Sequence, residues 1–261
     1  MIAIFEAFVL AIVQGITEWL PVSSSGHLAL IENIFGIADP VFYSVMLHFA
    51  TLFVVIVVFW KDVVRILKSY FIGDTEYQKL GLLVLLSVLP TAAIGFAFMK
   101  YFEAAYTNYF TIAAAFFVTA ILLMFFRFAT EKRKKVCVVD ALVVGVAQGI
   151  AIIPGISRSG ATIATGRFLG LRREIAAKFA FLMFIPAIIG ATGYQMIYRS
   201  EEIAYATTDW GALILAMITA AVVGYFALKF VLRTIKRNAF HKFSYYCFAV
   251  GVVSLILGLA L

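Results

Sequence analysis

Six stretches of 19 to 23 residues in this chain contain no Asp, Glu, Lys or Arg. A bilayer core about 30 Å thick is crossed by roughly 20 helical residues, so each stretch is long enough to span a membrane. Only 13% of the residues are charged, against about 25% in soluble domains. The low charged fraction excludes a soluble enzyme. Together with the six uncharged stretches, it predicts an all-α integral membrane protein with six full transmembrane helices. These helices are expected at 40–60, 80–99, 104–126, 179–198, 210–228 and 243–261.

The segments between these stretches differ in positive charge. Segments 61–79, 127–178 and 229–242 hold 19 of the 21 Lys and Arg residues, and the segments that alternate with them hold 2. Because cytoplasmic loops carry the excess of positive charge, the first set is predicted to lie in the cytoplasm and both termini outside. The chain is thus predicted to form a single multi-pass domain, 1–261, in the cell membrane.

Two regions, 1–39 and 127–178, are left over by this count. Each must begin and end on one side of the membrane, and Pro, Ser and Gly clusters interrupt its apolar runs. We therefore predict two re-entrant helix-turn-helix segments, which are tolerated where protein or a wet cavity satisfies the backbone. Two ordinary hairpins that cross fully would preserve the same topology and are the alternative.

The two left-over regions contain related sequences. QGITEWLPVSSSG at 14–26 and QGIAIIPGISRSG at 148–160 agree at six of thirteen positions at a constant offset of 134. Three long apolar stretches follow each of them, and the charge bias gives the two halves opposite orientations. The chain is therefore predicted to be an inverted-topology repeat, with halves at about 1–130 and 135–261, a design that builds midplane sites in many transporters.

A helix that starts inside the membrane directs unpaired N–H groups and a positive dipole end into the cavity, where they favour an anion. Ser- and Gly-containing turns lead into such helices at 27–35 and 161–169. Two helix ends that meet from opposite sides predict a site for a polyanionic group. The predicted phosphate-binding residues are Gln14, Ser23, Ser25, Gly26, Ser157, Ser159, Gly160 and Thr162.

Ionisable side chains in these apolar surroundings are candidates for chemistry. Glu18 is costly there unless it is paired or hydrated, and Gln14 lies one helical turn before it. His27 can act as an acid or a base near neutral pH, and the guanidinium of Arg158 matches phosphate oxygens in pairs. An ion pair between Glu18 and Arg158 that only closes the structure is the alternative. His48, within an apolar stretch, is interpreted as a packing residue or one behind the site.

These features favour an anion-handling membrane protein, either an enzyme or a transporter. The net charge of +7 also suggests nucleic acid, but in so apolar a chain the basic residues mark the cytoplasmic face, so no nucleic-acid partner is expected. Cys137 and Cys247 lack metal-ligand spacing, so neither a zinc site nor a disulfide framework is predicted. A transporter or flippase for a phosphorylated lipid is the alternative to an enzyme.

The two related segments resemble the motifs of the undecaprenyl-pyrophosphate phosphatase family, of the bacitracin-resistance type. The first motif runs from Gln14 to His27 and the second, Pro-Gly-x-Ser-Arg-Ser-Gly-Ala-Thr, from Pro154 to Thr162. The resemblance implies a membrane phosphatase that hydrolyses a polyprenyl diphosphate to the monophosphate and inorganic phosphate. Such an enzyme recycles the lipid carrier of peptidoglycan synthesis, has an outward-facing active site and confers bacitracin resistance.

The resemblance also implies roles for single residues. Glu18 matches the acidic group of the family, Ser24 its central hydroxyl, His27 its histidine and Arg158 its arginine, so these four are the predicted catalytic residues. By hypothesis, Ser24 attacks the terminal phosphorus while His27, oriented by Glu18, accepts its proton. Attack by an activated water, with Ser24 only binding, is the alternative.

A divalent cation such as Mg²⁺ is implied by the same resemblance. Many members have a second Glu where this chain has Gln14, and an amide is a weaker ligand and no base. The expected metal ligand is Glu18, with Gln14 left open as a second. The lipid tail is expected between helices, near residues such as Phe116, Phe117 or Phe181. Membrane lipids surround the protein, and a homo-oligomer is left open.

Overall fold

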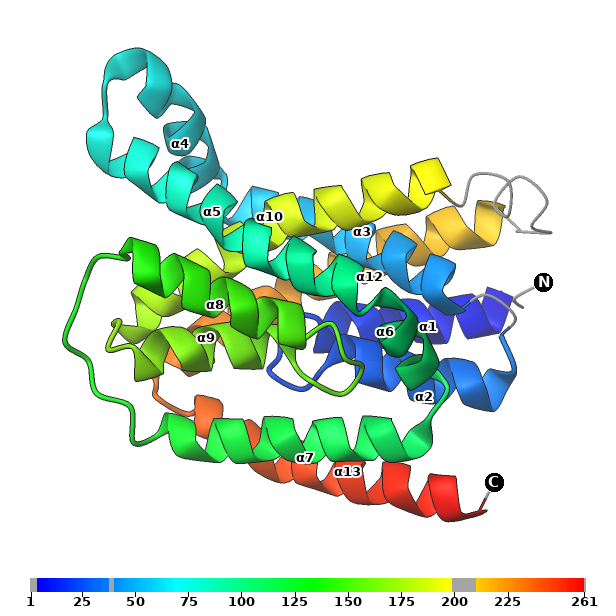
Figure 1. The fold of residues 1–261 in the computed structure, drawn as a ribbon. Helices are drawn as coiled ribbons and strands as arrows, with labels where there is room; N and C mark the ends of the chain where they lie inside the picture. Colours follow the sequence, from blue (N-terminus) through cyan, green and yellow to red (C-terminus); the bar gives the residue numbers. More distant parts are fainter. Residues whose placement is uncertain (1–3, 38–39, 199–209, 261) are drawn as a thin grey trace.

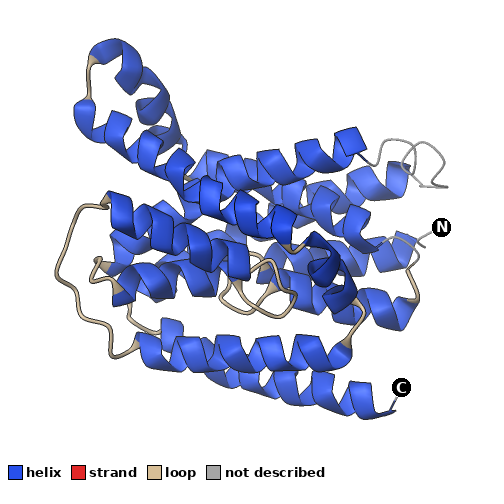
Figure 2. Ribbon diagram, viewed as in Figure 1, coloured by secondary structure: helices blue, strands red, loops and turns tan. Residues whose placement is uncertain are grey.

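The membrane-spanning elements are helices of the expected length. The structure is a computed structural model that describes residues 4–37, 40–198 and 210–260, and within these ranges it contains helices and no strand (Figure 2). This confirms the prediction of an all-α membrane protein. Among the described residues, five helices are long and apolar enough to cross a membrane: α5 (Thr75–Ala97), α7 (Tyr109–Phe126), α10 (Arg173–Tyr198), α12 (Trp210–Lys236) and α13 (Phe243–Ala260), the last with the 3-10 turn η1 (Phe240–Lys242) before it.

The count rises to six if α3 (Pro40–Val58) and α4 (Trp60–Ile72), which are bent by 78° relative to each other, are taken together as one broken span. The charge count gave the segment 61–79 a location and no secondary structure, so α4 is a new element. The predicted span 104–126 is divided, because α6 (Met99–Tyr106) ends before Asn108, whose side chain caps α7 by accepting a hydrogen bond from the N–H of Thr111 at 3.0 Å. The outer segment 199–209 lies outside the described residues.

The two left-over regions form two pairs of short helices. The first pair is α1 (Ile4–Thr17) and α2 (Ser24–Phe35), and the second is α8 (Val138–Ile150) and α9 (Arg158–Phe168). The longest of the four has 14 residues, which at 1.5 Å per residue is about 21 Å and too short for the bilayer core. Their lengths fit re-entrant segments, although their placement in a membrane stays a prediction.

The closely packed helix pairs each join one helix from the first half of the chain to one from the second half (Figure 1). Helix α1 packs against α12, and α8 packs against α5. Helix α3 packs against α10, and α7 packs against α13. If α1 corresponds to α8, and α5 to α12, the same pairing occurs twice. The pattern agrees with a two-fold repeat, but the inverted repeat and its boundaries at 1–130 and 135–261 stay predictions.

Arg133 links the start of α8 to the end of α9. The guanidinium of Arg133 donates to both carboxylate oxygens of Asp140, at 2.8 and 2.7 Å, and to the carbonyl of Leu169 at 2.5 Å. Asp140 lies in the first turn of α8, and Leu169 ends α9. A paired, charge-assisted contact of this kind is strong and directional, so it fixes α8 against α9 and holds their connecting turn in place.

Candidate active site

The turns of the two helix pairs lie in direct contact near the centre of the molecule (Figure 1). The N–H of Gly155 donates to Ser23 Oγ at 3.1 Å, and Ser159 Oγ donates to the carbonyl of Leu20 at 3.0 Å. A Cβ placed on Gly26 would lie 2.7 Å from Gly155 Cα, so the absence of a side chain permits this approach. The turns therefore form one continuous wall.

Each turn ends in the same serine cap. Ser23 Oγ accepts a hydrogen bond from the N–H of Gly26 at 3.2 Å, and Ser157 Oγ accepts one from the N–H of Gly160 at 3.1 Å. Ser23 has a φ of 65°, which is unfavourable for a residue with a side chain and is held here by its hydrogen bonds. The Thr162 hydroxyl donates to the backbone of its own helix. These five predicted phosphate-binding residues, with Ser159, thus shape the turns.

Glu18 lies at the centre of the buried polar network, just after the end of α1. Its Oε2 accepts hydrogen bonds from Gln14 Nε2 at 3.0 Å and from Ser24 Oγ at 2.5 Å. His48 Nε2 lies 3.0 Å from the same oxygen, and Arg158 Nη1 lies 3.4 Å from Oε1. Charge-assisted contacts compensate the cost of burying the carboxylate. The structure thereby brings together Gln14, Glu18, Ser24 and Arg158.

His48 belongs to this network, and its contact with Glu18 agrees with a residue behind the site rather than with one that only packs. On α3 its Nδ1 faces the carbonyl of Ser44 at 2.6 Å, so Nδ1 carries a hydrogen. Its Nε2 faces the carboxylate of Glu18 at 3.0 Å and lies 3.4 Å from Ser24 Oγ. Two acceptors would repel each other at 3.0 Å, so one proton lies between His48 and Glu18. The signal for this residue was the cost of an unpaired imidazole in an apolar span, the argument that marked Glu18.

His27 is turned away from the carboxylate. Its Nδ1 donates to the carbonyl of Ser23 at 2.7 Å, and its Nε2 lies 2.8 Å from the hydroxyl of Tyr246, against which the ring stacks. Both ring nitrogens are thus satisfied by groups outside the network. Within the described residues, the side-chain hydrogen bonds of Ser24 lead instead to Glu18 and His48. The predicted role of His27 as the base stays a prediction that this geometry does not favour.

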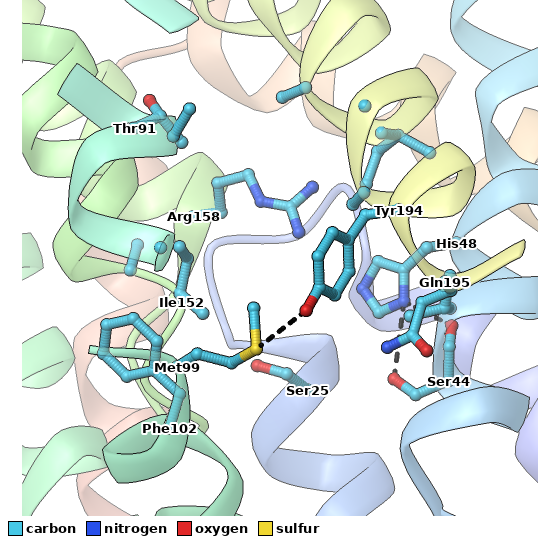
Figure 3. A pocket seen from close by; sticks show the side chains of 18 of the residues that line it. Ser25, Ser44, His48, Thr91, Met99, Phe102, Ile152, Arg158, Tyr194 and Gln195 are labelled. Atoms are coloured by element: carbon cyan, nitrogen blue, oxygen red, sulfur yellow. Dashed lines mark hydrogen bonds between the residues drawn. The ribbon is translucent and has the colours of Figure 1, made fainter. Parts of the chain in front are cut away.

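A cavity of about 370 Å³ opens beside the network (Figure 3). Arg158, Ser25 and His48 supply polar groups to its wall, and the Arg158 guanidinium points into it while lying 5.0 Å from the ring of Phe184. Most of the remaining wall is apolar and comes from α3, α5, α6, α10 and the turn after α8. Its larger side chains are Phe96, Met99, Phe102, Ile152 and Tyr194.

The expected contacts of the lipid tail are partly wrong. Phe116 is 0% exposed and Phe181 is 2% exposed, so both belong to the protein core and have no surface to offer a lipid chain. Phe117 packs against Phe248 of α13. Aromatic and apolar character, the property these three residues share, does not distinguish a core position from a cavity wall.

The residues at this site do not fit a preformed Mg²⁺ site. Both carboxylate oxygens of Glu18 already face hydrogen-bond donors or a cation. Of the side-chain oxygens of Gln14 and Glu18, only Gln14 Oε1 lacks a hydrogen-bond partner among the described residues. Within the same ranges, no group of three or more His, Cys, Asp or Glu residues is arranged to hold a metal ion. One amide oxygen and a saturated carboxylate fall short of the several oxygens that Mg²⁺ requires.

A hydroxyl bonded to a buried carboxylate, with a guanidinium opposite, is suited to attack on a phosphoryl group whose negative charge must be neutralised. Because this set lies beside an apolar cavity among membrane-spanning helices, the fold and site define a membrane-embedded enzyme for an anionic, lipid-like substrate.

Comparison with known proteins identifies the family. A family model described as bacitracin resistance protein BacA matches residues 7–253, and the chain belongs to this family. A protein of Carboxydothermus hydrogenoformans is 39% identical, over 97% of each chain, and one of Desulfosudis oleivorans is 40% identical, over 97% of this chain and 98% of the relative. A protein of the archaeon Korarchaeum cryptofilum is 38% identical, over 97% of this chain and 99% of its own. All three are named undecaprenyl-diphosphatase.

Proposed function

We propose that this protein hydrolyses undecaprenyl diphosphate to undecaprenyl phosphate and inorganic phosphate, and so recycles the lipid carrier of cell-wall synthesis. The observation that carries the proposal is the 2.5 Å hydrogen bond from Ser24 Oγ to Glu18, whose other carboxylate oxygen contacts Arg158, a residue in the wall of an apolar cavity. The names of the relatives support the same reaction. They do not favour the flippase alternative.

Arg158 receives the diphosphate in this mechanism. Its contact with Glu18 is 3.4 Å long and its side chain is 27% exposed, so the guanidinium can turn to a phosphate that enters the cavity. A planar guanidinium binds two phosphate oxygens at once. Ser25 lies on the same wall and can donate a further hydrogen bond. The apolar part of the wall holds the first isoprene units of the lipid.

Ser24 is the nucleophile. Glu18 removes the proton from Ser24 Oγ as this oxygen attacks the terminal phosphorus and the bridging P–O bond breaks. The products of this step are a phosphoserine and undecaprenyl phosphate, whose bridging oxygen takes the proton. A water then attacks the phosphoserine, returns a proton to Ser24 and releases inorganic phosphate. His48 positions Glu18 and balances its charge through the contact at 3.0 Å.

We further propose that the site opens to the extracytoplasmic side. The distribution of Lys and Arg supports this orientation, because 19 of the 21 lie in the alternate segments assigned to the cytoplasm. The cavity includes Glu103 and Tyr106, which follow α5 at the end opposite to the basic hairpin of α4 (Figure 1). Undecaprenyl diphosphate released on the outer face would therefore enter directly.

Phosphate release from purified protein tests the reaction. Ser24→Ala should lower kcat on the order of 10³-fold or more, and Arg158→Ala should act mainly on the charged transition state, by about 10²-fold or more. Ser254→Ala is the matched control, because Ser254 is buried and donates within its own helix α13. Rapid acid quenching with substrate labelled at the terminal phosphate should trap labelled Ser24.

Two outcomes would contradict the proposal. Near-normal turnover of folded Ser24→Ala protein, without a labelled enzyme intermediate in the wild type, would favour attack by water. Absence of phosphate release from wild-type protein, together with movement of the intact diphosphate lipid across sealed vesicles, would establish the flippase alternative.

A further inference from the structure

Helix α4 carries an apolar stripe that faces away from the protein. Trp60, Leu67 and Phe71 are 58%, 62% and 91% exposed. They are separated by seven and four residues, so at 3.6 residues per turn they lie along one face of the helix. An exposed stripe of large apolar side chains indicates a surface that is covered by something other than water.

The opposite side of α4 is already packed. Ser69 is buried, and its carbonyl accepts a hydrogen bond from Gln78 of α5 at 2.7 Å. A Cβ on Gly81 of α5 would lie 2.8 Å from a methyl carbon of Ile66, which shows how closely the two helices approach. The stripe is therefore not the face that α4 uses to join the protein.

Basic side chains flank the stripe. Lys61 and Lys68 are exposed, seven residues apart and on one edge of it, and within the described part of the chain neither forms an ion pair. Arg65, one turn from each, is held by Asp74 at 2.8 Å. An apolar face with lysines at its edge is typical of a helix in the interface of an anionic membrane.

The orientation of α4 matches such a position. It is bent by 78° from the spanning helix α3, so it runs nearly parallel to the membrane plane when α3 is upright. Its 13 residues, about 20 Å long and four of them charged, cannot cross the bilayer core. Figure 1 shows α4 and the start of α5 projecting beyond the bundle, at the end where residues 127–137 connect α7 and α8.

We propose that α4 is an interfacial helix that binds the surface of the surrounding bilayer. Trp60, Leu67 and Phe71 enter the boundary between headgroups and acyl chains, while Lys61 and Lys68 contact the headgroup phosphates of anionic phospholipids. The identification of this leaflet as the cytoplasmic one rests on the orientation proposed above, but the lipid contact itself does not. Because α5 begins in the same hairpin and contributes Thr91 and Phe96 to the cavity, bilayer contact braces one wall of the site.

Tryptophan fluorescence in reconstituted vesicles tests this proposal. The background protein carries Trp60→Phe and Trp210→Phe, and the tryptophan that remains, Trp19, is buried in the core. In this background, Phe71→Trp places a reporter in the stripe. Glu76→Trp, at the exposed start of α5, is the matched control. Vesicles contain brominated phosphatidylglycerol or brominated phosphatidylcholine. The Phe71→Trp reporter should be quenched by brominated lipid, more strongly by the glycerol lipid, and shielded from aqueous iodide, whereas the control should respond to iodide.

The lysines provide the second arm of the test. Lys61→Gln with Lys68→Gln should remove the preference for phosphatidylglycerol over phosphatidylcholine, since each lysine near an anionic surface contributes about fivefold to binding. Quenching of the Phe71→Trp reporter by iodide alone would overturn the proposal, and so would shielding from both quenchers, which would mean that another protein or a second copy covers α4. Equal quenching by the two lipids in the wild-type lysine background would overturn the anionic assignment. Phosphate release is measured in a separate assay, so failure of the lipid-contact proposal can be distinguished from failure of the proposed reaction.

Discussion

Glu18 and His48 illustrate how one physical rule gave two different interpretations. Both are polar groups in apolar surroundings and are costly there unless they find partners. Glu18 was selected because it is an ionisable group in an apolar stretch with Gln14 one helical turn before it, whereas His48 was interpreted as a packing residue or one behind the site because its sequence neighbours are Phe, Leu and Ala. The structure pairs the two side chains at 3.0 Å across different helices. Sequence distance carries no information about such a contact.

Comparison of the two histidines separates their roles. His48→Ala should lower kcat by about 10²-fold or more with little effect on KM, because Glu18 loses the group that orients it and balances its charge. His27→Ala should cost less than tenfold, since its ring nitrogens bond to Ser23 and Tyr246. The measurement is steady-state phosphate release, with Tyr246→Phe as the control that removes the same hydrogen bond from the other side. A loss in His27→Ala as large as that in Ser24→Ala would restore His27 as the base.

The cation can be examined at position 14. Gln14→Glu places a second carboxylate next to Glu18 and should create a Mg²⁺ site that the wild-type residues do not preform, because Mg²⁺ is held through one or two carboxylates together with substrate phosphates. The expected result is a half-saturating Mg²⁺ concentration at least about tenfold lower than in wild-type protein, measured by titration after chelation. An unchanged titration curve would show that the cation binds away from Gln14 and Glu18.

At the scale of elements, the site depends on the close approach of two turns that are far apart in sequence. Ser23 and Ser157 cap helices α2 and α9, and their hydroxyls fix each turn before any ligand arrives. Gly26 and Gly155 remove the side chains that would separate the turns. The repeated motif predicted that these turns would be alike and would meet. It did not predict that several of the serines would be occupied in holding them together.

A methyl group at the point of contact should disturb both stability and activity. Gly26→Ala places its Cβ 2.7 Å from the backbone of Gly155, and the resulting shift should lower the free energy of unfolding by about 1–3 kcal/mol. Gly193→Ala is the control, because open space surrounds that helical glycine and alanine should add about 0.5 kcal/mol of stability. Thermal unfolding in detergent measures both. A Gly26→Ala protein as stable and active as the control would show that the turns are free to separate.

At the scale of the whole molecule, the remaining question is which side of the membrane the cavity faces. In a background of Cys137→Ser and Cys247→Ser, a membrane-impermeant maleimide added to intact cells should label Glu103→Cys and leave Glu76→Cys unlabelled until the cells are opened. Both positions are exposed in the structure, so access to the reagent depends on the side alone. The reverse pattern would invert the proposed orientation and place the site in the cytoplasm.

The sequence by itself determined the all-α membrane class, the six long apolar stretches, the two interrupted regions and most residues of the polar network. These follow from local quantities: the length of an uncharged stretch, the cost of a buried charge and the identity of a motif. Only the tertiary structure decided that His48 joins Glu18, that His27 turns to Tyr246, that Phe116 and Phe181 belong to the core, and that α4 presents an apolar stripe. The physical reason is that a side chain's partners are set by helix crossing and rotation, which depend on the packing of the entire chain.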